Sequence, residues 1–236
     1  MKNVLITGAS RGIGKSIAKE LSFDYNVFAT ARNEELLKEL NVTDYCVCDF
    51  LKDDDISNLI EFVKQNNIDI LINNAGDYIY SKIDEVKEEQ VSSIFKINSI
   101  TPIVLSSAVV PYMKSQKWGR IINIGSISGV MGEACASCYS ATKASLIGFS
   151  KALALELASD NITVNTINPG WVDTQLGEKS IEDSEFSPEE IMESIPQKRF
   201  VEPVEVANLV KYLISEEAKG ITGQSINLCA GLSVGI

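Results

Sequence analysis

Short runs of apolar residues alternate with segments of helical periodicity along almost the whole chain. The apolar runs predict seven strands, at residues 4–7, 27–30, 45–48, 70–73, 121–124, 163–167 and 225–228. Between these runs, apolar positions recur at helical spacing, which predicts helices near 11–23, 34–40, 53–66, 88–115, 139–158 and 203–215.

The predicted strands are rich in Val and Ile and apolar at nearly every position, as is typical of parallel strands with helices on both faces. The alternation of strands and helices indicates βαβ units with right-handed connections. We therefore predict an α/β fold, a doubly wound parallel sheet with helices on both faces. No linker, repeat or low-complexity tract divides the chain, so residues 1–236 are predicted to form a single domain.

One segment interrupts this alternation. Residues 174–199 are acidic and polar, with helix-like pieces and no predicted strand. Long excursions of this kind in compact α/β domains commonly form lids over binding sites. The segment follows the sixth predicted strand, so we expect it at the carboxyl edge of the sheet, where ligands bind in this architecture. We predict that it is a substrate lid.

Composition narrows the range of partners. The chain has 236 residues, of which 45% are hydrophobic, and a formal net charge of −11. This charge argues against nucleic acid or an anionic membrane surface as a partner. No stretch approaches the roughly 20 apolar residues of a membrane span, and the first apolar run is too short for a signal peptide. A cytoplasmic protein is expected.

The chain contains no histidine, which excludes Ser-His-Asp catalysis, Cys-His catalysis and histidine-based metal sites. Cys46 and Cys48 alternate in a predicted strand, so both are expected to point to one face as small apolar side chains. Cys135 and Cys138 form a C-x-x-C pair, for which a zinc or redox role stays open. Since no second pair accompanies it, we predict reduced thiols and no metal site.

A glycine-rich turn, TGASRGIG at residues 7–14, joins the first predicted strand to the first predicted helix. Glycines in this context allow a tight turn and let the backbone approach a pyrophosphate at the start of the helix. The strand–turn–helix setting distinguishes the motif from an isolated glycine pattern. It predicts a Rossmann-type dinucleotide site with the following contacts: Gly8, Ser10, Arg11, Gly12, Ile13 and Gly14.

The end of the second predicted strand bears on which dinucleotide is bound. Binding of NAD usually requires an acidic residue there, which accepts hydrogen bonds from the ribose hydroxyls. Here Ala31 stands in that place and Arg32 follows it, while Arg11 can reach the same region. Two guanidinium groups without a carboxylate suit a 2′-phosphate. NADP(H) is therefore favoured over NAD(H).

Tyr139 and Lys143 are four residues apart in a predicted helix, so their side chains share one face. A free phenol, with a pKa near ~10, exchanges protons poorly at neutral pH. A cation about 5 Å away, at an effective dielectric constant of about 20, is expected to lower that pKa by roughly 2 units. Tyr139 would then act as a general acid or base, with the Ser126 hydroxyl holding a substrate oxygen. The alternative is that YSATK only begins an amphipathic helix.

Four features occur in order along the chain: the glycine turn, NNAG at residues 73–76, the Ser126, Tyr139 and Lys143 spacing, and NPG at residues 168–170. Together they resemble the classical short-chain dehydrogenase/reductases over essentially the whole chain. Within the family, GRIINIGSISG, YSATKASLIGFSKALALELA and ITGQSINL are most similar to 3-oxoacyl-[acyl-carrier-protein] reductases.

The resemblance implies roles for individual residues. Ser126 would bond the substrate carbonyl, Tyr139 would give it a proton, and Lys143 would hold the nicotinamide ribose. Asn98 matches the asparagine that anchors a water relay to this lysine. The remaining implied cofactor contacts are Asp49 and Phe50 at the adenine, Asn74, Ala75 and Gly76 along the cofactor, Val172 and Thr174 at the carboxamide, and Pro169 and Gly170 in the same turn.

The implied reaction is the NADP(H)-dependent reduction of a ketone to a secondary alcohol, with a 3-oxoacyl thioester of fatty acid biosynthesis as the expected substrate. A free ketone or secondary alcohol of hydroxysteroid or polyketide type is the alternative, because Cys229 resembles the residue at this place in some polyketide ketoreductases. A non-catalytic NADP(H)-binding regulator is a further alternative, which the intact catalytic set disfavours.

The resemblance also implies partners. Lys114, Lys117 and Arg120 are expected beside the cleft, where they would suit an acidic acyl carrier protein. Asp160 and the acidic lid oppose such a partner, since like charges slow the encounter. A homotetramer is implied, which would use the helices near 88–115 and 139–158 and the C-terminal segment.

Overall fold

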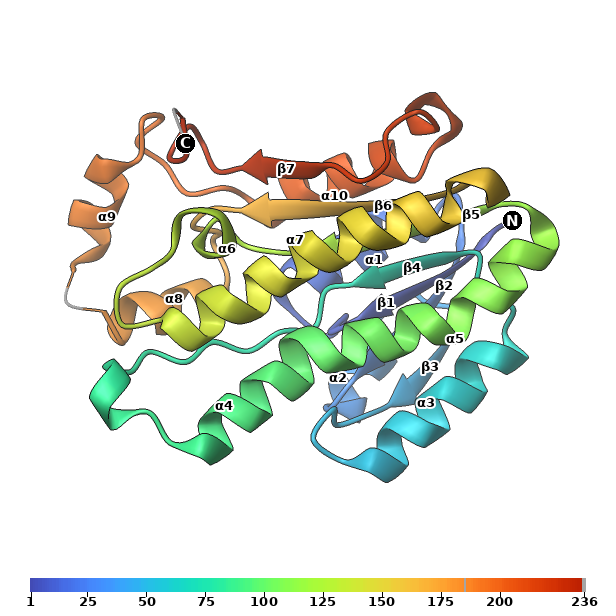
Figure 1. Cartoon of the computed structure of the whole chain (residues 1–236), viewed down its shortest axis with the longest axis horizontal. Coiled ribbons are helices and arrows are strands. Elements are labelled where there is room, and N and C mark those ends of the chain that lie inside the picture. Colours follow the sequence, from blue (N-terminus) through green and yellow to red (C-terminus); the bar gives the residue numbers. More distant parts are fainter. Residues whose placement is uncertain (185, 235–236) are drawn as a thin grey trace.

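A computed structural model describes residues 1–184 and 186–234. Within them, seven parallel strands form one sheet in the order β3-β2-β1-β4-β5-β6-β7 (Figure 1). The strands are β1 (Asn3–Thr7), β2 (Asn26–Ala31), β3 (Asp44–Val47), β4 (Ile70–Asn73), β5 (Gly119–Ile124), β6 (Ile162–Pro169) and β7 (Ser225–Leu228). The predicted doubly wound parallel sheet is confirmed, and every predicted strand overlaps an observed one.

The strand order creates a switch point between β1 and β4. From β1 the chain moves outward through β2 to β3, then returns to β4 and continues outward to β7. Ile6 of β1 accordingly pairs with Ala29 on one side and with Ile72 on the other. The loops that leave β1 and β4 diverge at their carboxyl ends, which opens a crevice there.

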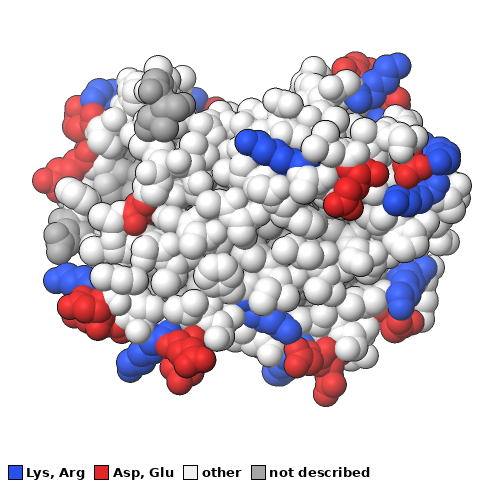
Figure 2. Space-filling model, in the orientation of Figure 1, with Lys and Arg blue, Asp and Glu red and all other residues white. Residues whose placement is uncertain are grey.

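Helices cover both faces of the sheet (Figure 1). On one face α1 (Gly12–Leu21) packs against α10 (Pro203–Leu213). On the other lie α3 (Asp53–Gln65), α5 (Thr101–Gln116) and α7 (Ser137–Leu157). Figure 2 shows that the centre of this second face carries few charged side chains, which gather instead toward the periphery.

The alternation of side chains along each strand supplies an apolar core to each face. In β1, Val4 and Ile6 join a core with Ile17 of α1 and Val210 of α10. Leu5, between them, joins the core on the opposite face. All of these side chains are buried, as expected when both faces of a parallel sheet are covered.

Shorter helices connect these layers. They are α2 (Glu34–Lys38), α4 (Glu88–Phe95), α6 (Ser128–Met131), α8 (Gln175–Glu182) and α9 (Pro188–Ser194), with the 3₁₀ helices η1 (Ile83–Glu85), η3 (Ala158–Asp160) and η4 (Glu216–Ala218). α8 and α9 form most of the segment predicted as a lid. Its described residues contain helices and no strand, as predicted.

The helix predicted near 88–115 runs from Glu88 to Gln116 with a π-helical turn, η2 (Lys96–Ile100), between α4 and α5. By length and composition alone, this helix could cross a membrane. It packs against α3, α7, β4 and β5, which is the setting of a core helix. The π turn contains Asn98, and turns of this kind frequently occur at functional sites.

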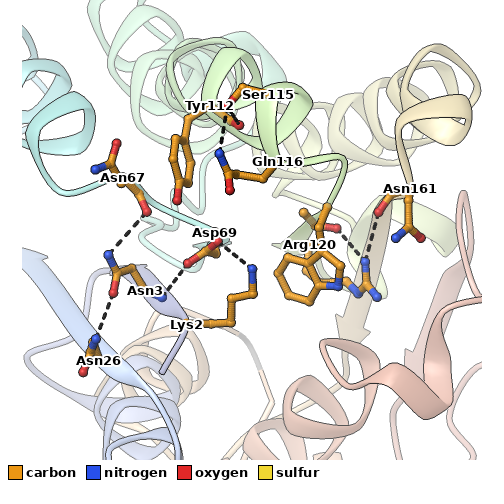
Figure 3. A network of polar contacts seen from close by, with 12 residues as sticks. Lys2, Asn3, Asn26, Asn67, Asp69, Tyr112, Ser115, Gln116, Arg120 and Asn161 are labelled. Carbon is orange, nitrogen blue, oxygen red and sulfur yellow. Dashed lines mark hydrogen bonds and ion pairs between the residues drawn. The ribbon is translucent and has the colours of Figure 1, made fainter.

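A polar network closes the amino-terminal edge of the sheet (Figure 3). Lys2 Nζ donates to Asp69 Oδ1 at 3.0 Å and lies 4.4 Å from the centre of the Trp118 ring. The guanidinium of Arg120 is fully buried, lies 4.3 Å from the same ring and donates to the carbonyl of Asn161 at 3.2 Å. This network joins the starts of β1, β4 and β5.

The prediction that Lys114, Lys117 and Arg120 lie beside the cleft of the chain is wrong. Arg120 stands near the start of β5, whereas Ile124 at the other end of that strand borders the cavity described below. Lys114 and Lys117 both form ion pairs with Asp160. The sequence identified the cations but not the strand end at which they lie.

Candidate active site

A cavity of about 510 Å³ lies at the switch point, along the carboxyl ends of the central strands. Of the predicted site residues, all but Asn98 and Gly14 line it. The lining set is Gly8, Ser10, Arg11, Gly12, Ile13, Arg32, Asp49, Phe50, Asn74, Ala75, Gly76, Ser126, Tyr139, Lys143, Pro169, Gly170, Val172 and Thr174.

The glycine turn is packed so closely that side chains are excluded from it. Gly8 has a φ of +65°, and a Cβ there would lie 2.8 Å from the Cα of Ala75. A Cβ on Gly14 would lie 2.2 Å from the carbonyl oxygen of Gly8 and 2.5 Å from Asn74 Nδ2. Gly14 therefore permits α1 to approach the turn and lies just behind the cavity wall, and its direct contact with the cofactor stays a prediction.

The loop after β4 is fastened to β1 across the switch point. Thr7 Oγ1 accepts hydrogen bonds from the backbone N–H groups of Asn74 at 3.0 Å and Ala75 at 2.9 Å. Asn74 Nδ2 donates in turn to the carbonyl of Thr7 at 2.8 Å. These bonds hold the two diverging loops at a fixed separation, which shapes the middle of the cavity.

The residues at the end of β2 are arranged as the sequence predicted for a site that binds a 2′-phosphate. Ala31 occupies the last position of the strand, and Arg32 follows it on the cavity wall with Asn33. Among the described residues, no carboxylate from this strand end lines the cavity. Arg11 lines it as well, and its Nη1 donates to Oε1 of Gln175 at 3.3 Å. Two guanidinium groups thus border this part of the wall.

Asp49 and Phe50 border the cavity beyond the end of β3. Phe50 is 6% exposed and packs in the core on the α3 side. The Asp49 carboxylate accepts a hydrogen bond from the backbone N–H of Leu51 at 3.1 Å. This wall therefore presents a fixed carboxylate and a buried ring.

The turn after β6 forms the opposite wall. Gly170 is pressed against Cys229, because a Cβ on Gly170 would lie 2.9 Å from that of Cys229. Val172 bridges to Val201, and Thr174 caps α8 by accepting a hydrogen bond from the N–H of Gly177 at 3.1 Å. The lid is thereby anchored at the edge of the cavity.

Tyr139 and Lys143 lie one turn apart in α7, with Lys143 Nζ 5.7 Å from the centre of the Tyr139 ring. The prediction that Lys143 lowers the pKa of Tyr139 is wrong. Burial raises the pKa of Tyr139 to about 12; a hydrogen bond with Ser126 lowers it in part, and the nearby Glu133 raises it. Burial also lowers the pKa of Lys143 to about 8. Burial thus favours the neutral form of each of these two side chains.

Asn98 lies behind the cavity wall, fully buried. Its Oδ1 accepts from the N–H of Asp77 at 2.8 Å, and its Nδ2 donates to the carbonyl of Asp77 at 2.9 Å and to Thr142 Oγ1 at 3.1 Å. A Cβ on Gly76 would lie 3.4 Å from both Asn98 Oδ1 and Lys143 Nζ. Asn98 and Lys143 thus approach the same glycine from two helices, and Lys143 Nζ donates to the carbonyl of Ile124 at 3.0 Å.

Several cavity residues were not predicted from the sequence, among them Tyr78, Ser128, Glu133 and Trp171. Ser128 Oγ lies 3.1 Å from Ser126 Oγ and donates to Glu133 Oε2 at 2.6 Å. The short spacing from Ser126 to Ser128 could have suggested this serine. Nothing in the local pattern marks Glu133 or Tyr78, because both reach the cavity through loop conformation.

The cysteines are all free thiols. Cys46 and Cys48 both pack on the α3 side of the sheet, which confirms the prediction that they share one face. Burial raises the pKa of the Cys48 thiol to about 12. Within residues 1–184 and 186–234, no group of three or more His, Cys, Asp or Glu side chains could hold a metal ion.

Comparison with known proteins agrees with this geometry. The family model described as short chain dehydrogenase matches residues 2–185. The 3-oxoacyl-[acyl-carrier-protein] reductase FabG of Staphylococcus epidermidis is 37% identical to the chain, over 98% of each protein. FabG of Escherichia coli is 36% identical, over 98% of this chain and 97% of that protein.

Two solved structures share the whole architecture. A variant of actinorhodin polyketide ketoreductase with NADPH has a TM-score of 0.92 and 36% identity, over 99% of this chain and 97% of that one. YwfH, an NADPH-dependent reductase involved in bacilysin biosynthesis, has a TM-score of 0.93 and 28% identity, over 100% and 99%. With the family model matching most of its length and relatives above one third identity over nearly all of it, the chain belongs to the short-chain dehydrogenase family of oxidoreductases.

Proposed function

We propose that the chain is an NADPH-dependent ketoreductase that reduces a 3-oxoacyl thioester to the 3-hydroxyacyl thioester. One observation carries the proposal: Ser126, Tyr139 and Lys143 border the same cavity as the glycine turn and Arg32. A hydroxyl, a phenol and a lysine therefore stand next to a wall shaped for a dinucleotide. The relatives named 3-oxoacyl-[acyl-carrier-protein] reductase support the choice of substrate class.

The cofactor is NADP(H). The glycine turn excludes a Cβ where the backbone would approach a pyrophosphate, and Arg11 and Arg32 border the place of a ribose 2′-phosphate. Of the two solved structures named above, the polyketide ketoreductase was solved with NADPH, and YwfH is an NADPH-dependent reductase. When bound, NADPH supplies the hydride that reduces the carbonyl carbon.

The residues of the chain would supply orientation and the proton. The hydroxyls of Ser126 and Tyr139 would donate hydrogen bonds to the carbonyl oxygen, which stabilises the negative charge that develops on it. Burial keeps the Tyr139 phenol protonated at neutral pH. It can transfer the Oη proton to that oxygen because the alkoxide that develops there is a stronger base than a phenolate. Lys143 would hold the nicotinamide ribose, and Asn98 would position the backbone around Asp77 beside it.

A free polyketide-type ketone is the second candidate substrate. The structural similarity to the polyketide ketoreductase favours it, at 36% identity over nearly the whole chain. Cys229, which is buried against Gly170 and within 3.2 Å of Ser233 Oγ, is the residue of this chain that suggested the same relationship from sequence.

An acyl carrier protein is not required by this proposal. Lys114 and Lys117 are paired with Asp160, and the described part of the lid is rich in Asp and Glu. Like charges disfavour the approach of an acidic carrier. We propose that the thioester is recognised largely through its acyl and thioester groups.

The experiment that tests the substrate is NADPH oxidation with an acetoacetyl thioester beside a panel of free ketones and steroids. The proposal expects the highest kcat/KM for the thioester. A free ketone preferred by more than about tenfold, equivalent to about 1.4 kcal/mol of transition-state binding, would replace the thioester by the second candidate.

We further propose a homotetramer in the cytoplasm. The face formed by α4, α5 and α7 has few charges at its centre, and Ile103 and Leu155 are 40% and 84% exposed (Figure 2). Free thiols suit a reducing compartment. Sedimentation that shows a stable monomer at micromolar concentration would contradict the tetramer.

A further inference from the structure

A carboxylate stands on the wall of the cavity close to the reacting hydroxyls of the proposed function. Glu133, in the loop before α7, lines the cavity and is partly buried. Its Oε2 accepts a hydrogen bond from Ser128 Oγ at 2.6 Å, and its Oε1 accepts one from Tyr78 Oη at 2.7 Å. Both oxygens of the carboxylate are thus engaged by side chains that also line the cavity.

Each partner of Glu133 contacts one of the two proposed proton donors. Because a carboxylate can only accept, Ser128 directs its proton to Glu133, and its Oγ accepts the Ser126 proton at 3.1 Å until a substrate oxygen takes that hydrogen bond. The N–H of Ser128 donates back to Ser126 Oγ at 3.1 Å. On the other side, the ring of Tyr78 packs edge-to-face on that of Tyr139, with centroids 5.0 Å apart.

We infer that Glu133 is a positioning residue for the reduction, which fixes the position of Ser126 Oγ through Ser128 and that of the Tyr139 ring through Tyr78. The inference rests on the proposed function, in which Ser126 and Tyr139 act on the carbonyl oxygen. One carboxylate thereby positions both hydroxyl groups, so the loss of its contact with Ser128 or with Tyr78 disturbs the geometry of proton transfer.

The charge of Glu133 provides a readout that a purely structural role would not change. Burial is the main cause of the raised pKa of Tyr139, and Glu133 raises it further. The other titratable groups around the two residues are Lys143 on α7, Tyr78 and Tyr80 after β4, and Lys82, Asp84 and Cys135 at a shallow recess beside Glu133. Removal of the carboxylate charge lowers the pKa of Tyr139. Since reduction needs the protonated phenol, the decline of activity in alkaline solution should then begin at a lower pH.

The test compares Glu133→Gln with Ser128→Ala and with Glu61→Gln, a matched charge change on an exposed residue of α3 outside the cavity. Steady-state reduction of an acetoacetyl thioester is followed over a pH series. Glu133→Gln is expected to lower kcat by roughly 10-fold or more, to leave the KM for NADPH unchanged and to shift the alkaline decline of kcat to lower pH. Ser128→Ala lowers kcat without that shift, and Glu61→Gln matches the wild type.

Two outcomes overturn the inference: a Glu133→Gln enzyme with wild-type kcat and pH profile, or one whose kcat falls while its profile stays in place. If Glu133→Gln does not fold, the kcat of Ser128→Ala decides. An unchanged kcat in that variant refutes the proposed link from Glu133 through Ser128 to Ser126. Failure of the proposed function gives a different result from failure of this inference, because the wild type itself would then oxidise no NADPH with any ketone.

Discussion

Lys143 Nζ lies 5.7 Å from the centre of the Tyr139 ring and donates to the carbonyl of Ile124 at 3.0 Å. The lysine is thus tied to the end of β5, the same strand from which Ser126 follows. Lys143 is buried and Tyr139 partly buried, and desolvation moves their pKa values in opposite directions, up for the phenol and down for the ammonium. The pair favours the neutral forms of both groups in alkaline solution.

This arrangement predicts how stability changes with pH. Burial lowers the pKa of Lys143 from 10.5 to about 8, so between these values the unfolded chain binds more protons at this residue than the folded chain. The contribution of Lys143 to the free energy of unfolding therefore rises with pH across that window. Urea unfolding from pH 8 to 10 should show a gain of about 2 kcal/mol in the wild type relative to Lys143→Met.

The matched control is Lys151→Met, since Lys151 is exposed on the same helix. That variant should keep the pH dependence of the wild type. Parallel stability curves for wild type and Lys143→Met would show that the buried ammonium does not have a lowered pKa.

The choice between NADPH and NADH depends on Arg32 at the end of β2. Loss of a charge-assisted hydrogen bond to the 2′-phosphate costs about 1.5–3 kcal/mol, so Arg32→Ala should raise the KM for NADPH by roughly 10- to 100-fold. The KM for NADH should change little, because NADH lacks that phosphate. Steady-state kinetics with both cofactors measures the difference.

Lys38→Ala serves as the control, because Lys38 is an exposed cation on the next helix that pairs with Glu34 and Glu35 outside the cavity. An equal rise in KM for NADPH and NADH in Arg32→Ala would remove the argument for a 2′-phosphate site.

The network at the amino-terminal edge predicts an asymmetric effect on stability (Figure 3). Arg120 is fully buried, whereas the side chain of its ion-pair partner Glu216 is 64% exposed. Arg120→Ala leaves a cavity and unpaired carbonyls and should cost about 3–5 kcal/mol of unfolding free energy. Glu216→Gln should cost less than about 1 kcal/mol, because water can replace an exposed carboxylate. Equal losses in chemical denaturation would show that the ion pair itself dominates.

The sequence predicts the sheet well because each strand is a short apolar run between polar turns. It also identifies Tyr139, Lys143 and Ser126, whose spacing is local or lies on adjacent elements. It fails where the outcome depends on three-dimensional burial. The helical spacing of Tyr139 and Lys143 suggested a lowered phenol pKa, but burial raises the pKa of Tyr139 instead.

Other features also depend on the packed structure. The close approach of α1 to Gly8, which Gly14 permits, is revealed only by the packed turn. The charge of Arg120 suggested a contact at the surface beside the cleft. The residue is instead buried at the start of β5, the end of the strand that lies away from the cavity. Glu133 belongs to no recognisable spacing, because it meets Ser128 and Tyr78 only through the folds of two loops.

The most direct test of the account is the reduction of an acetoacetyl thioester by NADPH in the wild type and in Tyr139→Phe. The wild type should form the 3-hydroxyacyl product, whereas Tyr139→Phe should bind NADPH normally and lose more than about 10²-fold in kcat, the scale of a lost general acid. Near-wild-type turnover by Tyr139→Phe would contradict the central claim that this phenol supplies the proton.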